Sequence, residues 1–327
     1  MNGTEPRTAA TFRGGVPGRR TPIRPVARAC GLVLATGLLG AASVWGQSIE
    51  PRAYSNAPVG THFLIMGYSE TSGGVPSDTA LPITDPELRV RSGILGYATV
   101  LDVGGRSAKF DVAVPYGWLS GSATYQGTEV RRTVDGLGDP VLRLSWNFVG
   151  APALSLREFR SYRQDLIVGA SLQVSVPVGQ YDSRKLVNLG TNRWFIKPEI
   201  GASKALGRWT VEATGAVTFF STNDDFFGGR RREQEPLYAI QTHVIYDIAP
   251  GTWLSFDATH FGGGHTTLDG VRINDRQDNW RAGVTLALPV AAQHSVKLFA
   301  STGVSARTGN NFDALGVAWQ YRWSGSN

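Results

Sequence analysis

After residue 47, apolar residues alternate with small or polar residues in segments of about ten residues. In residues 165–176, every second position from Leu166 to Val176 is apolar, and most positions between them are small or polar. A period of two places alternate side chains on opposite faces of a β-strand. Residues 209–220, 295–305 and 313–323 repeat this pattern, and helical periodicity is nearly absent. The pattern predicts an all-β protein.

The alternating segments predict twelve strands, at 61–71, 88–103, 107–121, 137–148, 165–177, 194–204, 209–221, 237–248, 252–262, 278–288, 295–306 and 311–323. An even number of strands places both chain ends on the same side of a membrane, as single-chain bacterial barrels require. Ten or fourteen strands remain alternatives, because residues 62–70 and 92–103 show no clean apolar face.

The connections between these segments alternate in length. The short ones are 104–105, 205–208, 249–251 and 289–294, and the long polar ones are 72–86, 122–136, 178–193, 222–236 and 262–277. Outer-membrane barrels have short periplasmic turns and long extracellular loops. We therefore predict a transmembrane antiparallel up-and-down β-barrel with its long loops outside the cell.

The link at residues 149–164 breaks the short-turn rule. Ser155 and Glu158 have the spacing of a capping box, which predicts the start of a short helix. We interpret this helix as a surface element across the barrel mouth, with a plug or a recognition element as the alternative.

Aromatic residues gather at the ends of the predicted strands, for example Trp118, Trp194, Trp209, Trp253 and Trp280. Such rings suit the two headgroup levels of a bilayer. The closing run Gly316, Trp319, Tyr321 and Trp323 resembles the signal by which the barrel-assembly machinery recognises outer-membrane barrels, although four residues follow Trp323. We expect that machinery, outer-membrane lipid and lipopolysaccharide as partners.

Residues 1–46 have the layout of a cleaved signal peptide, with an arginine-rich start, an apolar run at 29–44 and a small residue, Gly46, at the cut. The apolar run is short for a spanning helix, which leaves an uncleaved anchor as the weaker alternative. Arg19-Arg20 is a second alternative, as a twin-arginine signal. Cys30 precedes the apolar run, so we expect no lipidation, and the mature chain 47–327 would lack cysteine.

Positive charge is concentrated in this leader. Of the formal net charge of +6, residues 1–46 contribute +5, from six arginines and one glutamate, which leaves +1 for the rest. A nearly neutral body offers no single-signed face for phosphate backbones. The composition therefore excludes a nucleic-acid binder.

Charged residues recur on the face that the apolar pattern leaves pointing inward. They are Arg143, Lys197, Glu199, Glu212, Asp257, Arg281, Lys297 and Arg322, and His243 shares this face. A basic side chain in mid-membrane costs about 2–4 kcal/mol, so the lumen is the favoured place. There the charges line an aqueous route or pair across a closed lumen, and we expect Glu212 to reach Lys197 across a tight turn.

No set of residues indicates catalysis or metal binding. His243 could meet Asp257 of the neighbouring strand, but no serine lies in a Gly-x-Ser-x-Gly turn. Asp269, Asp275 and Asp278 form an acidic loop whose spacing matches no calcium loop. We expect no catalytic residues, no metal and no cofactor. The basic loop 228–233 is a weaker candidate for lipopolysaccharide phosphates.

Several ordered motifs point to a known family. They are the stretches 51–60, 138–140, 177–182, 188–194, 197–201, 223–227 and 318–323. Together they resemble the outer-membrane proteins of the phenol-degradation meta-pathway family, over essentially all of residues 47–327. The resemblance implies an outer-membrane barrel of a Gram-negative bacterium, associated in some members with aromatic-compound degradation, and it supplies no catalytic residues.

These features predict a passive channel for a small solute, aromatic or otherwise hydrophobic. A closed structural or surface-interaction barrel is the first alternative, and an outer-membrane lipolytic enzyme is the second.

Overall fold

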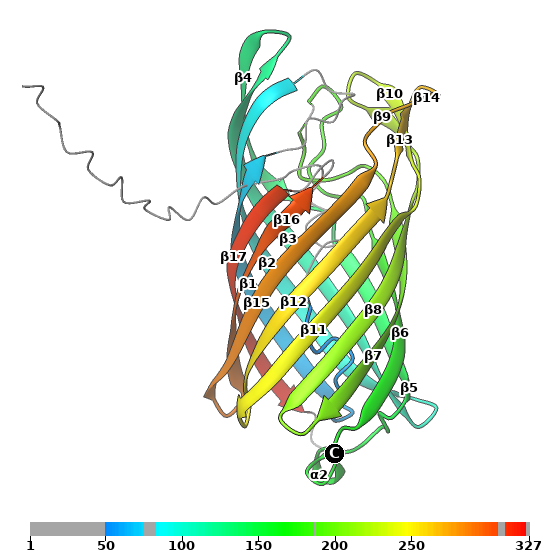
Figure 1. Ribbon diagram of the computed structural model, residues 1–327, viewed down its shortest axis with the longest axis vertical. Coiled ribbons are helices and arrows are strands. Elements are labelled where there is room, and N and C mark those ends of the chain that lie inside the picture. Colours follow the sequence, from blue (N-terminus) through cyan, green and yellow to red (C-terminus); the bar gives the residue numbers. More distant parts are fainter. Residues whose placement is uncertain (1–49, 75–82, 186, 307–310, 325–327) are drawn as a thin grey trace, which may run out of the picture. The chain divides into compact units, whose positions relative to one another are not determined.

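The computed structural model describes residues 50–74, 83–185, 187–306 and 311–324, and the predicted leader lies outside them. These residues form a closed antiparallel barrel of twelve strands (Figure 1). The barrel strands are β1 (Thr61–Gly74), β2 (Ile83–Val103), β3 (Arg106–Tyr125), β5 (Val141–Val149), β6 (Leu166–Ser175), β7 (Phe195–Leu206), β8 (Trp209–Phe220), β11 (Leu237–Ala249), β12 (Thr252–Gly263), β15 (Gln277–Ala291), β16 (His294–Ala306) and β17 (Asn311–Ser324). The predicted fold is confirmed, and the alternatives of ten or fourteen strands are wrong.

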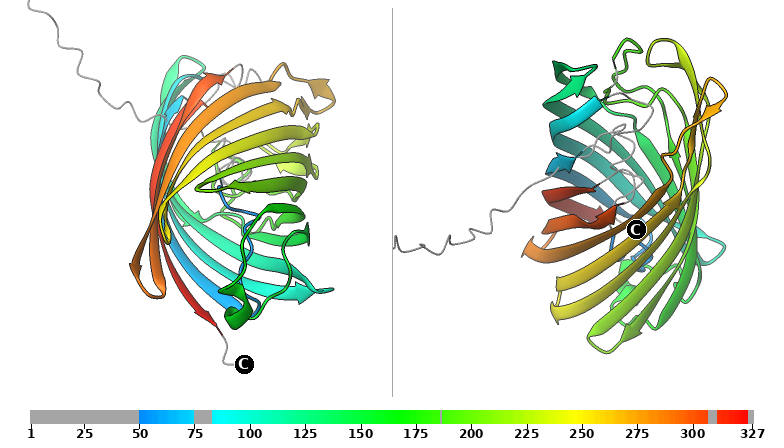
Figure 2. Two further views of the ribbon diagram at one scale, coloured as in Figure 1. Left: turned by 60° about the horizontal axis from the view of Figure 1, so that its bottom comes forward. Right: turned by 45° about the horizontal axis from the view of Figure 1, so that its top comes forward.

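The first and last strands close the barrel. β1 pairs with β17 in antiparallel register, with Thr61 opposite Ser324, and also pairs with β2 along residues 62–73. Figure 2 shows the strands tilted around a common axis from both ends. Closure pairs the backbone groups of every barrel strand on both sides, which a bilayer core demands because it offers no water.

The outer wall is apolar and the inner wall is mostly polar. Leu95, Leu144, Ile200 and Phe256 each expose more than half of their surface on the outside of the barrel. The positions between such residues are buried and often polar, as along β11, where Gln241 and His243 alternate with exposed neighbours. The apolar face therefore points outward, toward lipid.

Glycine forms the tight turns at one end of the barrel. Gly104, Gly105, Gly207 and Gly251 have φ between 61° and 78°, a left-handed conformation that other residues rarely adopt. The helix α2 (Leu156–Phe159) lies at the same end (Figure 1). This end is periplasmic in barrels of this type.

The capping box predicted for α2 is present. The Ser155 hydroxyl accepts a bond from the Glu158 N–H, and the Glu158 carboxylate accepts bonds from the hydroxyl and the N–H of Ser155. These bonds hold the pKa of Glu158 below its ordinary value, because they favour the charged carboxylate. Within the described part of the chain, no helix has the length and apolarity to cross a membrane.

Three of the predicted long loops, 122–136, 222–236 and 262–277, contain strands besides the twelve of the barrel. β4 (Thr128–Leu137) pairs with the upper part of β3. β9 (Asn223–Phe226), β10 (Arg230–Gln234), β13 (Thr266–Leu268) and β14 (Val271–Arg272) form a separate four-stranded sheet at the extracellular end. Phe226 and Leu268 are buried between this sheet and its neighbours, which gives the loops an apolar core that alternation alone does not predict.

Candidate functional site

The chain preceding β1 lies inside the barrel. We call residues 50–60 the lumen segment. The Lys109 ammonium on β3 donates to the Ala53 carbonyl, and the Asn147 amide on β5 donates to the Tyr54 carbonyl at 3.1 Å. On the opposite wall, the Glu212 carboxylate of β8 accepts the Arg52 N–H at 2.7 Å. The lumen segment is thus attached to several strands at once.

The Tyr54 side chain packs into the space left by two glycines of the inner wall and so anchors the lumen segment. Gly169 of β6 and Gly201 of β7 lie directly opposite each other. A Cβ on Gly201 would lie 2.3 Å from the Tyr54 ring, and one on Gly169 would lie 2.7 Å from it. The Tyr54 hydroxyl donates to Glu199 at 2.9 Å, and only 2% of the residue is exposed. The small residues of this wall therefore make room for Tyr54.

Ion pairs bind the lumen segment to the wall. Arg143 of β5 pairs with Asp111 of β3 at 2.9 Å and with Glu50 of the lumen segment. Arg52 of the lumen segment pairs with Asp247 of β11. Much of the lumen charge is therefore neutralised by contacts that hold the segment in place.

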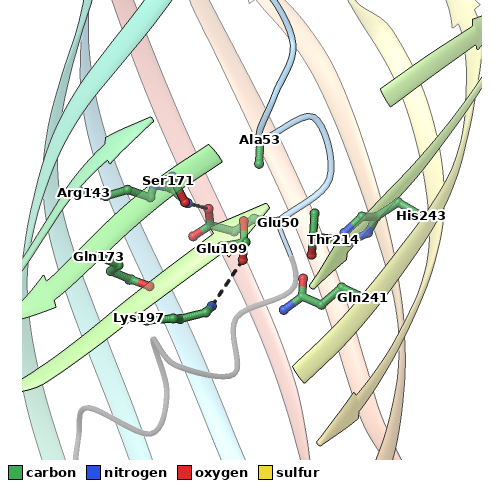
Figure 3. Close-up of a pocket in the computed structure, with 10 residues that line it drawn as sticks. All are labelled: Glu50, Ala53, Arg143, Ser171, Gln173, Lys197, Glu199, Thr214, Gln241 and His243. Carbon is green, nitrogen blue, oxygen red and sulfur yellow. Dashed lines mark hydrogen bonds and ion pairs between the residues drawn. The ribbon is translucent and has the colours of Figure 1, made fainter. Parts of the chain in front are cut away.

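The middle of the lumen is filled at the level of the predicted charged residues. Lys197 and Glu199 pair at 3.5 Å, and both point into the same space as Arg143 and His243 (Figure 3). The cavity among these side chains and Glu50 has a volume of about 20 Å³. Such a space holds about one water molecule. These side chains and the lumen segment narrow the lumen at this level.

The expected contact between Lys197 and Glu212 is absent, because Lys197 pairs with Glu199. Glu212 lies opposite Ser203 and accepts its hydroxyl at 2.8 Å. Ser203 is six positions further along β7 than Lys197, a separation of about 20 Å along a strand. The tight turn therefore brings Ser203 to Glu212 and leaves Lys197 far above it.

His243 and Asp257 do meet, across β11 and β12. His243 Nδ1 lies 2.7 Å from the Asp257 carboxylate, which also accepts the Ser255 hydroxyl at 3.2 Å and the Thr285 hydroxyl at 3.4 Å. His243 is 1% exposed. Ser255 thus donates to the acid and not to the histidine, an order that differs from a nucleophile–base–acid chain.

The three remaining predicted lumen residues lie in different places. Arg281 is buried beside Phe312, whose carbonyl accepts its guanidinium at 2.9 Å. Lys297 lies 5.8 Å from the ring centre of Trp253 near the periplasmic end. Arg322 is exposed near the end of β17 and donates to the Ala292 carbonyl in a turn. Arg322 therefore belongs to the periplasmic rim and not to the depth of the lumen.

Trp253 also lies elsewhere than expected. We predicted it at a headgroup level, but it is 8% exposed and packs against Ile245 inside the barrel. Trp253 shares its face of β12 with Ser255 and Asp257, which lie at every second position after it and point into the lumen. The Trp253 ring therefore points inward as well. Trp118, Trp194, Trp209 and Trp280 are each 46–49% exposed on the outside.

The assembly-signal residues divide between the two faces of β17. Gly316 faces inward, where a Cβ would lie 2.2 Å from the Phe299 ring. Trp319, Tyr321 and Trp323 form a stacked row with ring centres 5.5–6.4 Å apart. The glycine accommodates a lumen aromatic, and the row continues the aromatic level of the outer wall.

Apolar side chains from β5, β7, β8, β11 and β12 cover one side of the inner wall toward its extracellular end, which alternation in the sequence did not reveal. We call this cluster the vestibule ring, and its members are Val141, Phe195, Phe220, Leu237 and Phe261. Sequence reasoning missed it because aromatic residues near strand ends were assigned to the bilayer. Phe219 is indeed 49% exposed, whereas its neighbour Phe220 points inward to the ring. Because neighbouring residues of a strand point to opposite faces, the positions of Phe219 and Phe220 in β8 are enough to assign one to the lipid and the other to the lumen.

A cation stands above the vestibule ring. The Arg193 guanidinium lies 4.3 Å from the centre of the Phe220 ring and donates to Gln234 at 2.6 Å. Its Nη1 is buried and has no hydrogen-bond partner among the described residues. Burial lowers the pKa of Arg193 well below its ordinary value, and repulsion from Arg232 lowers it further.

The acidic and basic loops bind each other. Asp269 accepts the Arg230 side chain at 2.7 Å and the Arg231 N–H at 2.8 Å, and these bonds lower the pKa of Asp269. Asp275 accepts the Thr266 N–H at 2.8 Å. Among the described residues, no group of three histidine, cysteine or acidic side chains is placed to hold a metal ion. The charged residues of these two loops therefore hold the β9–β10 hairpin against the turn between β13 and β14.

Comparison with known proteins agrees with this geometry. The structure is similar to the crystal structure of an outer membrane channel from Pseudomonas putida F1, with a TM-score of 0.69 and 22% identity over 84% of this chain and 100% of that chain. It also resembles the transport unit of the autotransporter AIDA-I from Escherichia coli, with a TM-score of 0.50 and 7% identity over 88% of this chain and 97% of that one. Both likenesses concern the fold. No curated protein sequence matches.

The family model described as "Putative MetA-pathway of phenol degradation" matches residues 70–321. This match covers most of the chain and confirms the resemblance inferred from the sequence motifs. The chain therefore belongs to this phenol-degradation family of outer-membrane barrel proteins.

Proposed function

We propose that this protein is an outer-membrane channel of a Gram-negative bacterium for the passive uptake of a small aromatic or otherwise hydrophobic compound. The vestibule ring carries this proposal, because it places an apolar cluster on the inner wall near the extracellular end. Phe195 and Phe261 are 3% and 1% exposed here, and a solute entering from outside would reach them once the residues that cover them move. Removing apolar surface from water is favourable by about 25 cal/mol per Å². A sugar or an ion gains nothing comparable there.

Passage requires the lumen segment to move. Polar and ionic contacts and the single anchor Tyr54 hold it, and it is paired as a strand with no barrel strand. The ion pair between Arg52 and Asp247 remains partly exposed, with 25% and 42% of the side chains accessible. Partly exposed pairs contribute little to stability, so this pair opposes movement of the segment only weakly. The channel is accordingly gated.

A closed structural barrel is the second candidate. The ion pairs between Arg143, Asp111 and Glu50 favour it, because they neutralise the lumen instead of leaving charge for solutes. Lys197→Met and Arg281→Met separate the two candidates. In a channel they change ion preference in planar bilayers, and in a closed barrel they leave conductance near zero.

We infer no enzymatic activity. Ser255 donates to Asp257 and lies outside any contact with His243, so the polar cluster supports a structural role. A lipolytic enzyme would need a serine beside the histidine.

The test is uptake of an aromatic solute into vesicles that contain the purified barrel. Phe261→Ala removes an inward ring that is 1% exposed, and Phe256→Ala on the same strand removes an outward ring that is 59% exposed. We expect Phe261→Ala to slow aromatic uptake several-fold, and Phe256→Ala to leave it unchanged. Equal uptake by vesicles with and without the wild-type barrel would refute the channel.

A further inference from the structure

A groove lies on the lipid-facing wall of the barrel at its extracellular rim. Residues of β11 and β12 line it, together with the segment before β11 and the connection from β12 to β15 that carries β13 and β14, and its volume is about 630 Å³. It is separate from the lumen, since Tyr238 and Ile240 line it with the outward side chains that β11 alternates with buried ones.

Gly262 makes this groove. In the sheet it lies between Tyr238 of β11 and Asp278 of β15. A Cβ at Gly262 would meet a single atom within 4 Å, His260 Cε1 at 3.4 Å, so the space above this position is open. A strand position without a side chain, flanked by larger neighbours, leaves a depression in the outer surface of the wall.

The lower wall of the groove is apolar and aromatic. Tyr238 and Ile240 are 56% and 60% exposed. Trp280, 49% exposed, packs against His260 with ring centres 4.8 Å apart. Aromatic rings at this height mark the headgroup level of the outer leaflet. Acyl chains of a lipid therefore have apolar surface to follow below this level.

Cations stand at the extracellular side of the groove. Arg276 directly precedes Gln277, the first residue of β15, and is exposed, with no hydrogen bond or ion pair within the part of the chain that the structure describes. Arg272 pairs with Glu235 at 2.8 Å, and His265 also lines the groove. The nearby acid Asp278 pairs with His260 at 2.9 Å. Among the residues that line the groove, Arg272 and Arg276 face the single acid Glu235, so the lining carries one positive charge in excess.

We propose that this groove binds lipid A, the phosphorylated glycolipid anchor of lipopolysaccharide in the outer leaflet. Its phosphate lies against Arg276 and Arg272, and an acyl chain follows Tyr238 and Ile240. Arginine suits phosphate because its planar guanidinium presents paired donors. This site replaces the basic loop 228–233 considered from the sequence, since Arg230 and Arg231 are paired with Asp269 and Glu233.

The test is native mass spectrometry of the purified full barrel with added diphosphoryl lipid A. Arg276→Gln removes the unpaired charge, and Gly262→Leu fills the groove. Arg208→Gln, an exposed arginine at the opposite rim, is the control. We expect Arg276→Gln to weaken binding about fivefold, the effect of one cation near an anionic lipid surface. Gly262→Leu weakens binding at least as much, and the control matches the wild type.

Monophosphoryl lipid A and inorganic phosphate distinguish a lipid site from a simple phosphate site. We expect weaker binding of the first and no competition from millimolar amounts of the second. Competition by phosphate alone, or wild-type binding by Arg276→Gln in barrels that keep heat-modifiable gel mobility, would overturn the proposal. Because Arg276 is exposed, that variant is expected to fold even if Gly262→Leu does not.

Discussion

At the scale of single residues, the inner wall of the barrel is matched to Tyr54. Gly169 and Gly201 leave the space that its ring fills, and Glu199 accepts its hydroxyl. The side chain that occupies their space comes from more than 110 residues earlier in the chain, so no local pattern indicates this contact.

Tyr54→Ala is expected to release the lumen segment. Truncating a buried aromatic ring costs about 3–5 kcal/mol. Here the loss weakens the binding of the lumen segment to the barrel wall. Single-channel recordings in planar bilayers should show higher conductance than the wild type. Tyr68→Ala, which removes a tyrosine that is 44% exposed on β1, should leave conductance unchanged. An unchanged conductance in Tyr54→Ala would mean that another contact keeps the lumen closed.

Arg143→Met is expected to destabilise the barrel. The change leaves Asp111 and Glu50 without their shared cation, and because these side chains are only partly buried, the cost is about 1–2 kcal/mol, less than for a fully buried pair. The temperature at which gel mobility changes from folded to unfolded should fall. Arg131→Met breaks an ion pair whose side chains are 81% and 58% exposed, and it should have almost no effect. Equal effects of both changes would contradict a bracing role for Arg143.

At the scale of elements, turn and loop lengths define the two ends of the barrel. Gly207 lies in a two-residue connection between β7 and β8, whereas Gly228 and Gly229 lie at the tip of the β9–β10 hairpin within a long connection. The long connections are ordered because Phe226 and Leu268 give them a small core. The short turns have too few residues to form such a core, so the barrel extends little beyond its strands at the periplasmic end.

A protease site inserted at Gly228 should be cleaved from outside intact cells. The same site inserted at Gly207 should be protected until the outer membrane is opened. Both glycines have left-handed backbone and open space around them, so the two insertions are structurally comparable. Cleavage at Gly207 in intact cells would show that the barrel has the opposite orientation. The vestibule ring and the rim groove would then lie at the periplasmic end.

At the scale of the whole molecule, the barrel has no free edge among its described strands. β17 returns to β1, and the described backbone is paired around the wall. Exposed leucine, isoleucine and phenylalanine cover its outside, while the inside carries ion pairs and the lumen segment. A molecule with this arrangement is stable in a bilayer and poorly soluble outside one.

The purified protein is expected to migrate faster on gels before heating than after it, because the closed barrel resists detergent at room temperature. It should fractionate with the outer membrane of the expressing cell. A soluble periplasmic product, or identical mobility before and after heating, would contradict a membrane barrel.

Much of this architecture follows from the sequence. A period of two is a local property, so the strands, their outward apolar face and their number are determined by neighbouring residues. Loop lengths and the capping box at Ser155 are local as well, and they set the orientation and the position of α2. The inward charges follow from the same parity, as the burial of Lys197, Glu212 and Asp257 illustrates.

The tertiary structure alone decided what these inward residues contact. Residues 50–60 carry no period, so nothing local indicates that they enter the lumen and meet Glu212, 160 positions away from Arg52. The strand register set Glu212 against Ser203, and Lys197 paired with Glu199 of its own strand. The vestibule ring and the rim groove likewise combine side chains of separate strands. Alternation determines which way a side chain points, and only the closure of the barrel determines what it meets there.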